Sequence, residues 1–236
     1  MPDKSTVDEI RARFDADVER FSSLDTGQAT TIDAPLVLDL IAEAAASVTP
    51  AARDLLDIGC GAGNYALRVL QELPGLSVDL IDLSRPMLDR AAERVGAATA
   101  GAVRTIQGDV RDLDLGEARY DLVVTGAALH HLRTEAEWEA VFASVHQSLR
   151  PGGSFWLSDL VTHDIEAVQA LMWQRYGDYL TDLKDEAFRD HVVAYVEKED
   201  TPRSLVYQLD LLRHAGFRKV DVLHKTSVFA AFGGVR

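Results

Sequence analysis

The sequence predicts an α/β fold whose sheet is mostly parallel and is covered by helices on both faces. From residue 53 onward, short apolar runs alternate with segments of helical periodicity, and glycine or proline stands at several junctions. Strands that alternate with helices of this length are typical of βαβ units. Five strands are predicted at residues 54–58, 76–81, 103–106, 120–124 and 154–158. Two closing strands, 217–223 and 227–232, complete a seven-stranded sheet.

Helices are predicted before, between and after these strands. In segment 5–21, apolar residues recur at helical spacing behind the capping residues Ser5 or Thr6. This helix either docks on the core or lies over an active site. A loop at residues 22–31 separates it from a second helix, which starts at Asp33 with Pro35 in its first turn. Further helices are expected at residues 64–73, 86–95, 135–149 and 202–216, with a turn at 151–153.

Residues 160–200 interrupt this alternation and predict a two-helix insertion after the fifth strand. The segment has ten acidic and four basic residues. We therefore expect one domain over residues 1–236, made of four parts. These are N-terminal helices (1–50), a cofactor-binding core (51–159), the helical insertion (160–200) and a closing helix and strands (201–236).

Composition narrows the classes of partner. Lys and Arg number 24 and Asp and Glu number 38, so the net charge is −14. Because nucleic-acid and anionic-membrane surfaces attract basic proteins, we expect neither as a partner. A single cysteine, Cys60, excludes an internal disulfide and a cysteine-cluster metal site, and no metal site is predicted. Residues 1–4 are polar, and no run approaches the roughly 18 apolar residues of a membrane span, so we expect a cytoplasmic protein.

Glycine and acidic residues gather where the predicted strands end. The first strand runs into a glycine bend at residues 57–63, and parallel α/β sheets bind ligands beyond such strand ends. A dinucleotide fingerprint needs glycine at position 64, where this chain has Asn64, and no phosphate-binding Gly-Lys-Ser/Thr follows. Asp82 stands 19 residues beyond Gly63, at the spacing of a carboxylate that accepts ribose hydroxyls. Asp109, after the third strand, can accept from an adenine amine.

As a set, these residues resemble the class I S-adenosylmethionine-dependent methyltransferases over roughly residues 54–159. The resemblance rests on residues 55–63, Asp82, Ser84, Met87, Leu88, residues 108–110, residues 129–132 and residues 151–153. It implies a Rossmann-like methyltransferase fold and S-adenosylmethionine as the cofactor.

The resemblance also implies where the cofactor lies. The glycine bend would pass around its methionine part, Asp82 would hold the ribose and Asp109 the adenine amine. Gly126 stands where the family places a residue near the amino-acid end of the cofactor. The expected cofactor-binding residues are Asp57, Gly59, Cys60, Gly61, Gly63, Asp82, Leu83, Met87, Asp109, Val110 and Gly126.

The N-terminal helix, the acidic insertion and the Gly-Gly ending are similar to one branch of this family. That branch holds the carboxy-S-adenosylmethionine synthases and relatives labelled tRNA wobble-uridine methyltransferases. It uses an arginine in the inserted helices to bind the additional carboxylate of its cofactor. The corresponding residues 179–183 contain no arginine, and Arg175 lies one turn upstream.

We therefore predict in-line SN2 transfer of a methyl group from S-adenosylmethionine to a small-molecule acceptor. Two alternatives stay open. One is an enzyme similar to carboxy-S-adenosylmethionine synthase or a tRNA-modifying enzyme. The other is a non-catalytic module that binds S-adenosylmethionine without turnover. The sulfonium is a strong electrophile, so alignment is the main requirement and a general base is optional.

The candidate general bases are His130, His131 and His163, all predicted at the carboxyl edge of the sheet. Either His130 or His131 could instead be a packed, hydrogen-bonded histidine. His163, Asp159 and Asp164 together resemble a metal site. Histidine and aspartate pairs in loops are more commonly turn residues or helix caps.

Aromatic residues with helical spacing mark the insertion. Trp173, Tyr176 and Tyr179 follow one another at intervals of three and predict one stripe on a helix. The stripe either forms a water-excluding wall against the substrate or packs on the sheet or on a second subunit. A homodimer formed through the insertion is therefore a possible assembly.

Overall fold

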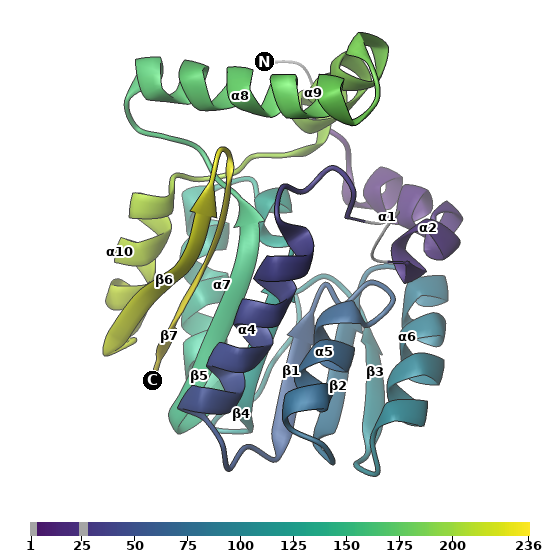
Figure 1. The fold of residues 1–236 in the computed structure, drawn as a ribbon. Helices are drawn as coiled ribbons and strands as arrows, with labels where there is room; N and C mark the ends of the chain where they lie inside the picture. Colours follow the sequence, from purple (N-terminus) through teal and green to yellow (C-terminus); the bar gives the residue numbers. More distant parts are fainter. Residues whose placement is uncertain (1–3, 24–27) are drawn as a thin grey trace.

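The computed structural model describes residues 4–23 and 28–236. The predicted polar start of the chain and part of the predicted loop 22–31 lie outside these residues. Seven strands form one sheet in the order β3-β2-β1-β4-β5-β7-β6. Pairing is parallel from β3 through β5, whereas β7 runs antiparallel to both β5 and β6. The predicted α/β, mostly parallel fold is confirmed (Figure 1).

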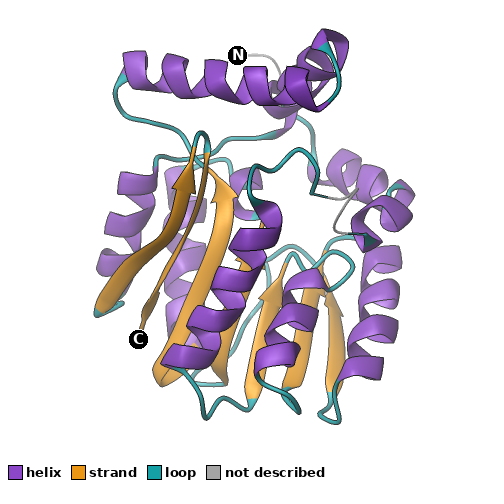
Figure 2. Cartoon of the chain, in the orientation of Figure 1, coloured by secondary structure: helices purple, strands orange, loops and turns teal. Residues whose placement is uncertain are grey.

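The elements follow the predicted alternation (Figure 2). The strands are β1 (Asp54–Ile58), β2 (Ser77–Asp82), β3 (Val103–Gln107), β4 (Tyr120–Gly126), β5 (Leu149–Leu160), β6 (Lys219–Thr226) and β7 (Phe229–Val235). The helices are α1 (Val7–Ala16), α2 (Val18–Ser22), α4 (Ala34–Val48), α5 (Asn64–Glu72), α6 (Arg85–Ala98), α7 (Glu135–Ser148), α8 (Glu166–Leu183), α9 (Glu186–Glu199) and α10 (Leu205–Ala215). A 3₁₀ turn, η1, spans Leu129–His131.

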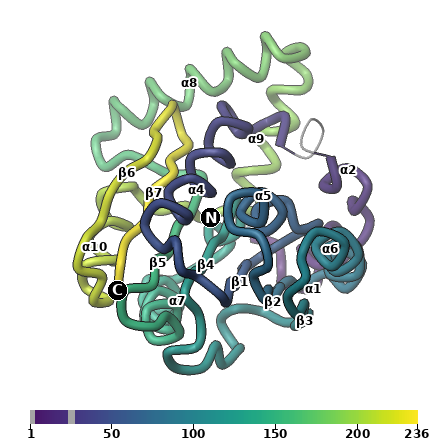
Figure 3. The backbone as a smooth tube through the Cα atoms, turned by 60° about the horizontal axis from the view of Figure 1, so that its bottom comes forward, coloured from purple at the N-terminus to yellow at the C-terminus, as the bar shows by residue number. Residues whose placement is uncertain are grey.

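Side chains from the two faces of the sheet belong to separate core clusters. On β1, Leu55 packs with α4, α5 and α6, whereas the next residue, Leu56, packs with α7 and α10. This alternation follows from the pleat of a strand, which sends successive side chains to opposite faces. Figure 3 shows β1, β4 and β5 between α4 and α5 on one side and α7 on the other. Burial on both faces explains why the parallel strands are short apolar runs.

Three local predictions are corrected. The helix predicted over residues 5–21 is two helices, because Asp17 leaves helical geometry at φ −110° and ψ 18°. The turn predicted at 151–153 lies within β5, where Gly152 donates to the carbonyl of Arg236 and Arg236 donates to that of Gly153. The closing strands start two residues later than predicted, because their hairpin turns at Ser227, which has φ +44°.

The helices that depart from the central alternation lie near the carboxyl ends of the parallel strands. In Figure 1, α8 and α9 cross above the sheet, and α1 and α2 lie beside α6. The predicted two-helix insertion is therefore present, and it stands over the edge where ligands bind in such sheets. Within residues 4–23 and 28–236, no helix combines the length and apolar character needed to cross a membrane.

Candidate active site

Two adjoining cavities open at the carboxyl edge of the sheet. The first is lined by the loop after β1, by the ends of β2, β3 and β4, and by apolar side chains of α1 and α2. The second, with a volume of about 480 Å³, lies between α1, α2, the ends of β4 and β5, α8 and α9. They share a wall composed of Phe14, Phe21, Gln28, Thr31, Tyr65, Ala127 and His131. A molecule in one cavity would therefore lie next to a molecule in the other.

The bend after β1 requires glycine at its first position. Gly59 has φ +63°, and a Cβ there would lie 2.5 Å from the Cβ of Ala128. The amide of Cys60 donates to the carbonyl of Ile81 at 2.9 Å, which fastens the bend to the end of β2. Gly59, Cys60 and Gly61 all line the first cavity. Burial raises the pKa of the Cys60 thiol, so this side chain is a neutral part of the wall.

Asp57 and Gly63 lie behind this bend and do not line either cavity. Oδ2 of Asp57 accepts from the amide of Ala66 at 3.1 Å and so holds the start of α5. Burial raises the pKa of Asp57 to about 8. Gly63 caps α5 at φ +84°, close to side chains of α6. These two residues therefore support the loop from behind in this structure.

Asp82 ties the bend to the next strand end. Its Oδ2 accepts from the amide of Gly61 at 2.8 Å, and its Oδ1 accepts from the amide of Ser84 at 2.9 Å. Burial raises the pKa of Asp82, although these hydrogen bonds by themselves would lower it. A carboxylate has about four lone-pair sites, so each oxygen can still accept from a ligand hydroxyl. The residues present therefore fit a ribose at this position.

Asp109 lines the same cavity and is held by a neighbour that the sequence analysis did not single out. The Nε of Arg111 donates to Oδ1 of Asp109 at 2.9 Å, and Arg111 also pairs with Glu137 on α7. Burial alone would raise the pKa of Asp109, but Arg111 outweighs burial and lowers it. Leu83, Met87 and Val110 complete the apolar part of this end of the cavity. The carboxylate is thus ionised and fixed in place.

Tyr65 is a second residue that the sequence analysis missed. It lies in the first turn of α5 and lines both cavities. Its ring packs on Gly126, where a Cβ would lie 2.1 Å from Cε2 of Tyr65. Gly126 also lines the first cavity, as the resemblance implied for a residue near the cofactor. Its lack of a side chain lets the tyrosine stand between the two cavities. The available sequence signal was the position of Tyr65 directly after the glycine bend.

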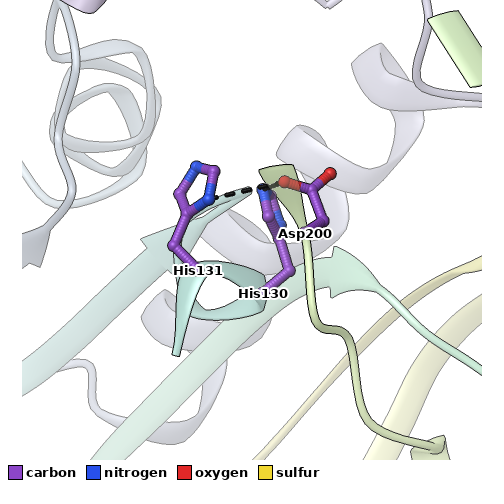
Figure 4. A group of neighbouring side chains, drawn as sticks. All are labelled: His130, His131 and Asp200. Atoms are coloured by element: carbon purple, nitrogen blue, oxygen red, sulfur yellow. Dashed lines mark ion pairs between the residues drawn. The ribbon is translucent and has the colours of Figure 1, made fainter. Parts of the chain in front are cut away.

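Four ionisable side chains meet in the second cavity. Nδ1 of His130 hydrogen-bonds to Oδ1 of Asp159, and the backbone amide of His130 donates to Oδ2 of the same carboxylate at 3.1 Å. Oδ1 of Asp200 lies 3.6 Å from Nε2 of His130 and 3.4 Å from Nδ1 of His131 (Figure 4). His131 also lines the first cavity.

The charges of this group act on the two histidines in opposite directions. Burial alone would lower the pKa of His130, but Asp200 and Asp159 outweigh burial and raise it to about 9. Burial, together with the charge of His130, lowers the pKa of His131. The two carboxylates therefore favour the protonated form of His130, whereas burial favours the neutral form of His131. Both histidines were predicted from the sequence as candidates, whereas Asp200, which follows α9 far along the chain, was not.

The remaining candidates lie apart from this group. His163 lines neither cavity; its backbone amide donates to Oε1 of Gln169, and its Nε2 lies 2.8 Å from Nζ of Lys225. Among the three aromatic residues of α8, Tyr176 lines the second cavity, whereas Trp173 and Tyr179 are absent from its wall. Both tyrosines donate to carbonyl groups near α4, of Thr30 and Ala29 respectively. The stripe therefore combines a cavity wall with packing.

The N-terminal helices close the site from outside. Phe14 of α1 and Phe21 of α2 line both cavities, and Asn64 donates to the carbonyl of Phe21 at 3.0 Å. Arg13 of α1 pairs with the buried Glu199 at 2.9 Å, which joins α1 to α9. Segment 5–21 was predicted either to dock on the core or to lie over an active site. These contacts agree with the second placement.

Comparison with known proteins agrees with this architecture. Residues 55–153 match a family model described as a methyltransferase domain. This segment of the chain is therefore similar to methyltransferase domains. The matched segment contains the glycine bend, Asp82, Asp109 and Gly126, and it leaves out α1, α2, α8 and α9.

Two curated relatives are similar to part of this chain. One is an uncharacterized methyltransferase of Synechocystis, 39% identical over 106 residues, which are 45% of this chain and 46% of that protein. The other is a carboxy-S-adenosyl-L-methionine synthase of a Shewanella strain, 30% identical over 128 residues, or 53% and 51% of the two chains. The chain thus spans about half the length of these relatives.

Solved structures share the fold of this chain. An O-methyltransferase family protein from Burkholderia thailandensis has a TM-score of 0.67 at 20% identity, covering 94% of this chain and 59% of the other. Human N-acetylserotonin methyltransferase, in complex with S-adenosylmethionine, has a TM-score of 0.60 at 16% identity, covering 96% and 56%.

Proposed function

We propose that this protein is an enzyme that binds S-adenosylmethionine in the first cavity and transfers its methyl group to a small-molecule acceptor in the second. The observation that carries the proposal is the shared wall of the two cavities, with Tyr65 and His131 in contact with both. The volume of the second cavity is within the range of small-molecule sites. The net charge of −14 supports a small acceptor over a nucleic acid.

In this proposal the residues of the first cavity hold the cofactor and aim it. The sulfonium of S-adenosylmethionine supplies the electrophilic methyl group. The glycine bend would accept its methionine part, Asp82 the ribose hydroxyls and Asp109 the adenine amine. Leu83, Met87 and Val110 would flank the adenine, which is apolar on both faces. Because the hydrogen bonds of Asp82 to Gly61 and Ser84 already fix its carboxylate, little ordering remains to be done on binding.

The residues of the second cavity would orient the acceptor and exclude water. Phe14, Phe21 and Tyr176 provide apolar walls, and the pair of His130 and His131 lies where the acceptor must approach. Proximity and orientation can supply about 7–11 kcal/mol of such a barrier, so this alignment is the main contribution. Proton acceptance by one of the histidines would add to it.

The carboxylated cofactor is the second candidate, favoured by the relatives named carboxy-S-adenosyl-L-methionine synthase. Arg175 is exposed and lines neither cavity, which supports the plain methyl donor. The two candidates, and a module that binds without turnover, differ in what the purified protein carries and does. Mass spectrometry of small molecules released from the protein would identify the donor. An acceptor screen that measures S-adenosylhomocysteine release would then test for turnover.

The expected results are S-adenosylmethionine or S-adenosylhomocysteine in the released fraction and tight binding of both in calorimetry. A carboxylated donor would move the proposal to the second candidate. Absence of binding heat with either compound would overturn it.

We also propose that residues 160–200 mediate a homodimer. Ile165, Leu171 and Leu183 are large apolar side chains exposed in or beside α8, in support of a contact there. Light scattering after size-exclusion chromatography would report a dimer mass, and a monomer mass at micromolar concentration would overturn this.

A further inference from the structure

The group at the end of η1 has the spacing of a metal site. Nε2 of His130, Nδ1 of His131 and Oδ1 of Asp200 all lie within 4.8 Å of one another (Figure 4). The two nitrogen-to-oxygen distances are 3.6 and 3.4 Å. Tetrahedral zinc, with ligands at about 2.0–2.1 Å, places its ligand atoms about 3.3–3.4 Å apart. One ion can therefore reach all three atoms after small movements of side chains.

The orientation of His130 supports the same interpretation. Asp159, whose side chain is 1% exposed, hydrogen-bonds to Nδ1 of His130 and also accepts from the amide of Leu160 at 2.7 Å. Nε2, the other ring nitrogen of His130, is turned toward Asp200. A metal ion that binds there would displace the proton that the two carboxylates favour on His130. Metal-binding histidines commonly have a carboxylate on the far ring nitrogen, which fixes the tautomer and the ring orientation.

An independent observation comes from Asp200. Its side chain is 4% exposed, and its Oδ1 is buried without a hydrogen-bond partner among residues 4–23 and 28–236. The nearby Lys4 donates to the backbone carbonyl of Asp200 and not to this oxygen. Oε1 of the neighbouring Glu199 is bound by Arg13 and Ser5. A buried carboxylate oxygen without a partner is costly, and a cation beside it would remove that cost.

We propose that His130, His131 and Asp200 bind one divalent transition-metal ion, for which Zn²⁺ is the best match. Two imidazoles and one carboxylate are a donor set that zinc accepts, and three protein ligands leave a fourth position open. All three residues line the second cavity, so that position can take water or an oxygen or nitrogen of the acceptor. Only this role toward the acceptor rests on the proposed function; metal binding does not.

The test uses the full-length protein stripped with a chelator. Titration with Co²⁺ should produce the visible absorption of a low-symmetry cobalt site, and Zn²⁺ should displace it at one ion per chain. Asp200→Asn and His131→Gln should abolish this binding. Asp159→Asn, which removes the support of His130, should weaken it about 10- to 100-fold. His214→Gln, a change at an exposed histidine of α10, should leave it unchanged.

Two results would overturn the site: wild-type protein that binds no Co²⁺ or Zn²⁺ at micromolar concentration, or variants that bind as wild type does. Circular dichroism tests whether each variant is folded. If a variant is unfolded, the titration of the wild-type protein alone tests the metal site. Calorimetry with S-adenosylhomocysteine in the presence of chelator separates this outcome from the proposed function. A protein that binds the nucleoside but no metal retains the methyltransferase proposal and loses the metal site.

Discussion

Replacing Gly126 by alanine tests whether the wall between the two cavities depends on one missing side chain. The new Cβ would lie 2.1 Å from Cε2 of Tyr65 and 2.5 Å from its Cζ. Carbon atoms in contact are about 3.5–4.0 Å apart, so the ring must move by about 1.4–1.9 Å. Because Tyr65 lines both cavities, its displacement changes the proposed donor site and the proposed acceptor site together.

The magnitude follows from overpacking. Extra methyl groups in a packed interior cost about 1–3 kcal/mol, and we expect Gly126→Ala to lower the free energy of unfolding by that amount. A misplacement near 1 Å at a reacting centre can cost about 100-fold in rate. Denaturant unfolding measures the first effect, and calorimetry with S-adenosylhomocysteine, followed by turnover once an acceptor is known, measures the second.

A double-mutant cycle locates the cause. In a Tyr65→Ala background the ring is absent, so adding the methyl group at Gly126 should cost little, and the coupling energy should be about 1–3 kcal/mol. Gly96→Ala is the matched control, because a Cβ on this α6 glycine meets no atom within 4 Å. Equal penalties for Gly126→Ala with and without the tyrosine ring would refute the reasoning.

The remaining predictions concern charge. Asp82→Asn should weaken binding of S-adenosylhomocysteine about 10- to 150-fold, because hydrogen bonds to a charged group contribute about 1.5–3 kcal/mol. Asp57 has a folded pKa of about 8, above its unfolded value, so its proton stabilises the fold at low pH and this is lost as pH rises toward 8. This proton makes the free energy of unfolding fall by up to about 1.4 kcal/mol per pH unit. Asp57→Asn should remove that dependence, as measured by unfolding at several pH values. Glu199→Ala should leave the buried end of Arg13 unpaired and speed hydrogen exchange in α1, with a loss of about 3–5 kcal/mol.

Each of these has an outcome that would count against it. Asp89→Asn, at an exposed carboxylate of α6 paired with Arg85, is the control for Asp82 and should bind as wild type does. Equal affinities for the two variants would remove Asp82 from the cofactor site. Parallel pH curves for wild type and Asp57→Asn would show that this carboxyl ionises normally. Unchanged exchange in α1 would mean that Glu199 does not hold it.

The central sheet could be predicted from the sequence because its signals are local. The glycine bend, the apolar strands and Pro86 at the start of α6 each act within a few residues, and periodicity separates strand from helix. The errors occurred where distant pairing decides the structure. Gly152 reads as a turn residue, yet its segment pairs with the last residue of the chain, and no local pattern reports that.

For the candidate site, the positions at strand ends could be predicted from the sequence in the same way. Asp82 and Asp109 stand at strand ends, and the topology of a parallel sheet brings such ends together. Arg111 and Tyr65 were missed because their importance lies in which side chain each one contacts. Asp200 was missed for a stronger reason: it lies 70 residues beyond His130 (200 − 130), and only the return of the chain after α9 places it there.

The division between these two kinds of residue also separates the proposed donor site from the proposed acceptor site. The segment that matches the methyltransferase domain ends at residue 153, and the first cavity is built chiefly from it. Most of the wall of the second cavity lies outside that segment, on α1 and α2, on the chain before and at the start of α4, at the end of β5, and on α8, α9 and the residue after α9. In this proposal, the segment with the domain match forms the donor site, and the acceptor depends on segments that the match does not cover. It follows that exchange of residues 160–200 for those of a relative should change the preferred acceptor and leave the affinity for S-adenosylhomocysteine within a few-fold. Loss of both together would show that the insertion also shapes the donor site.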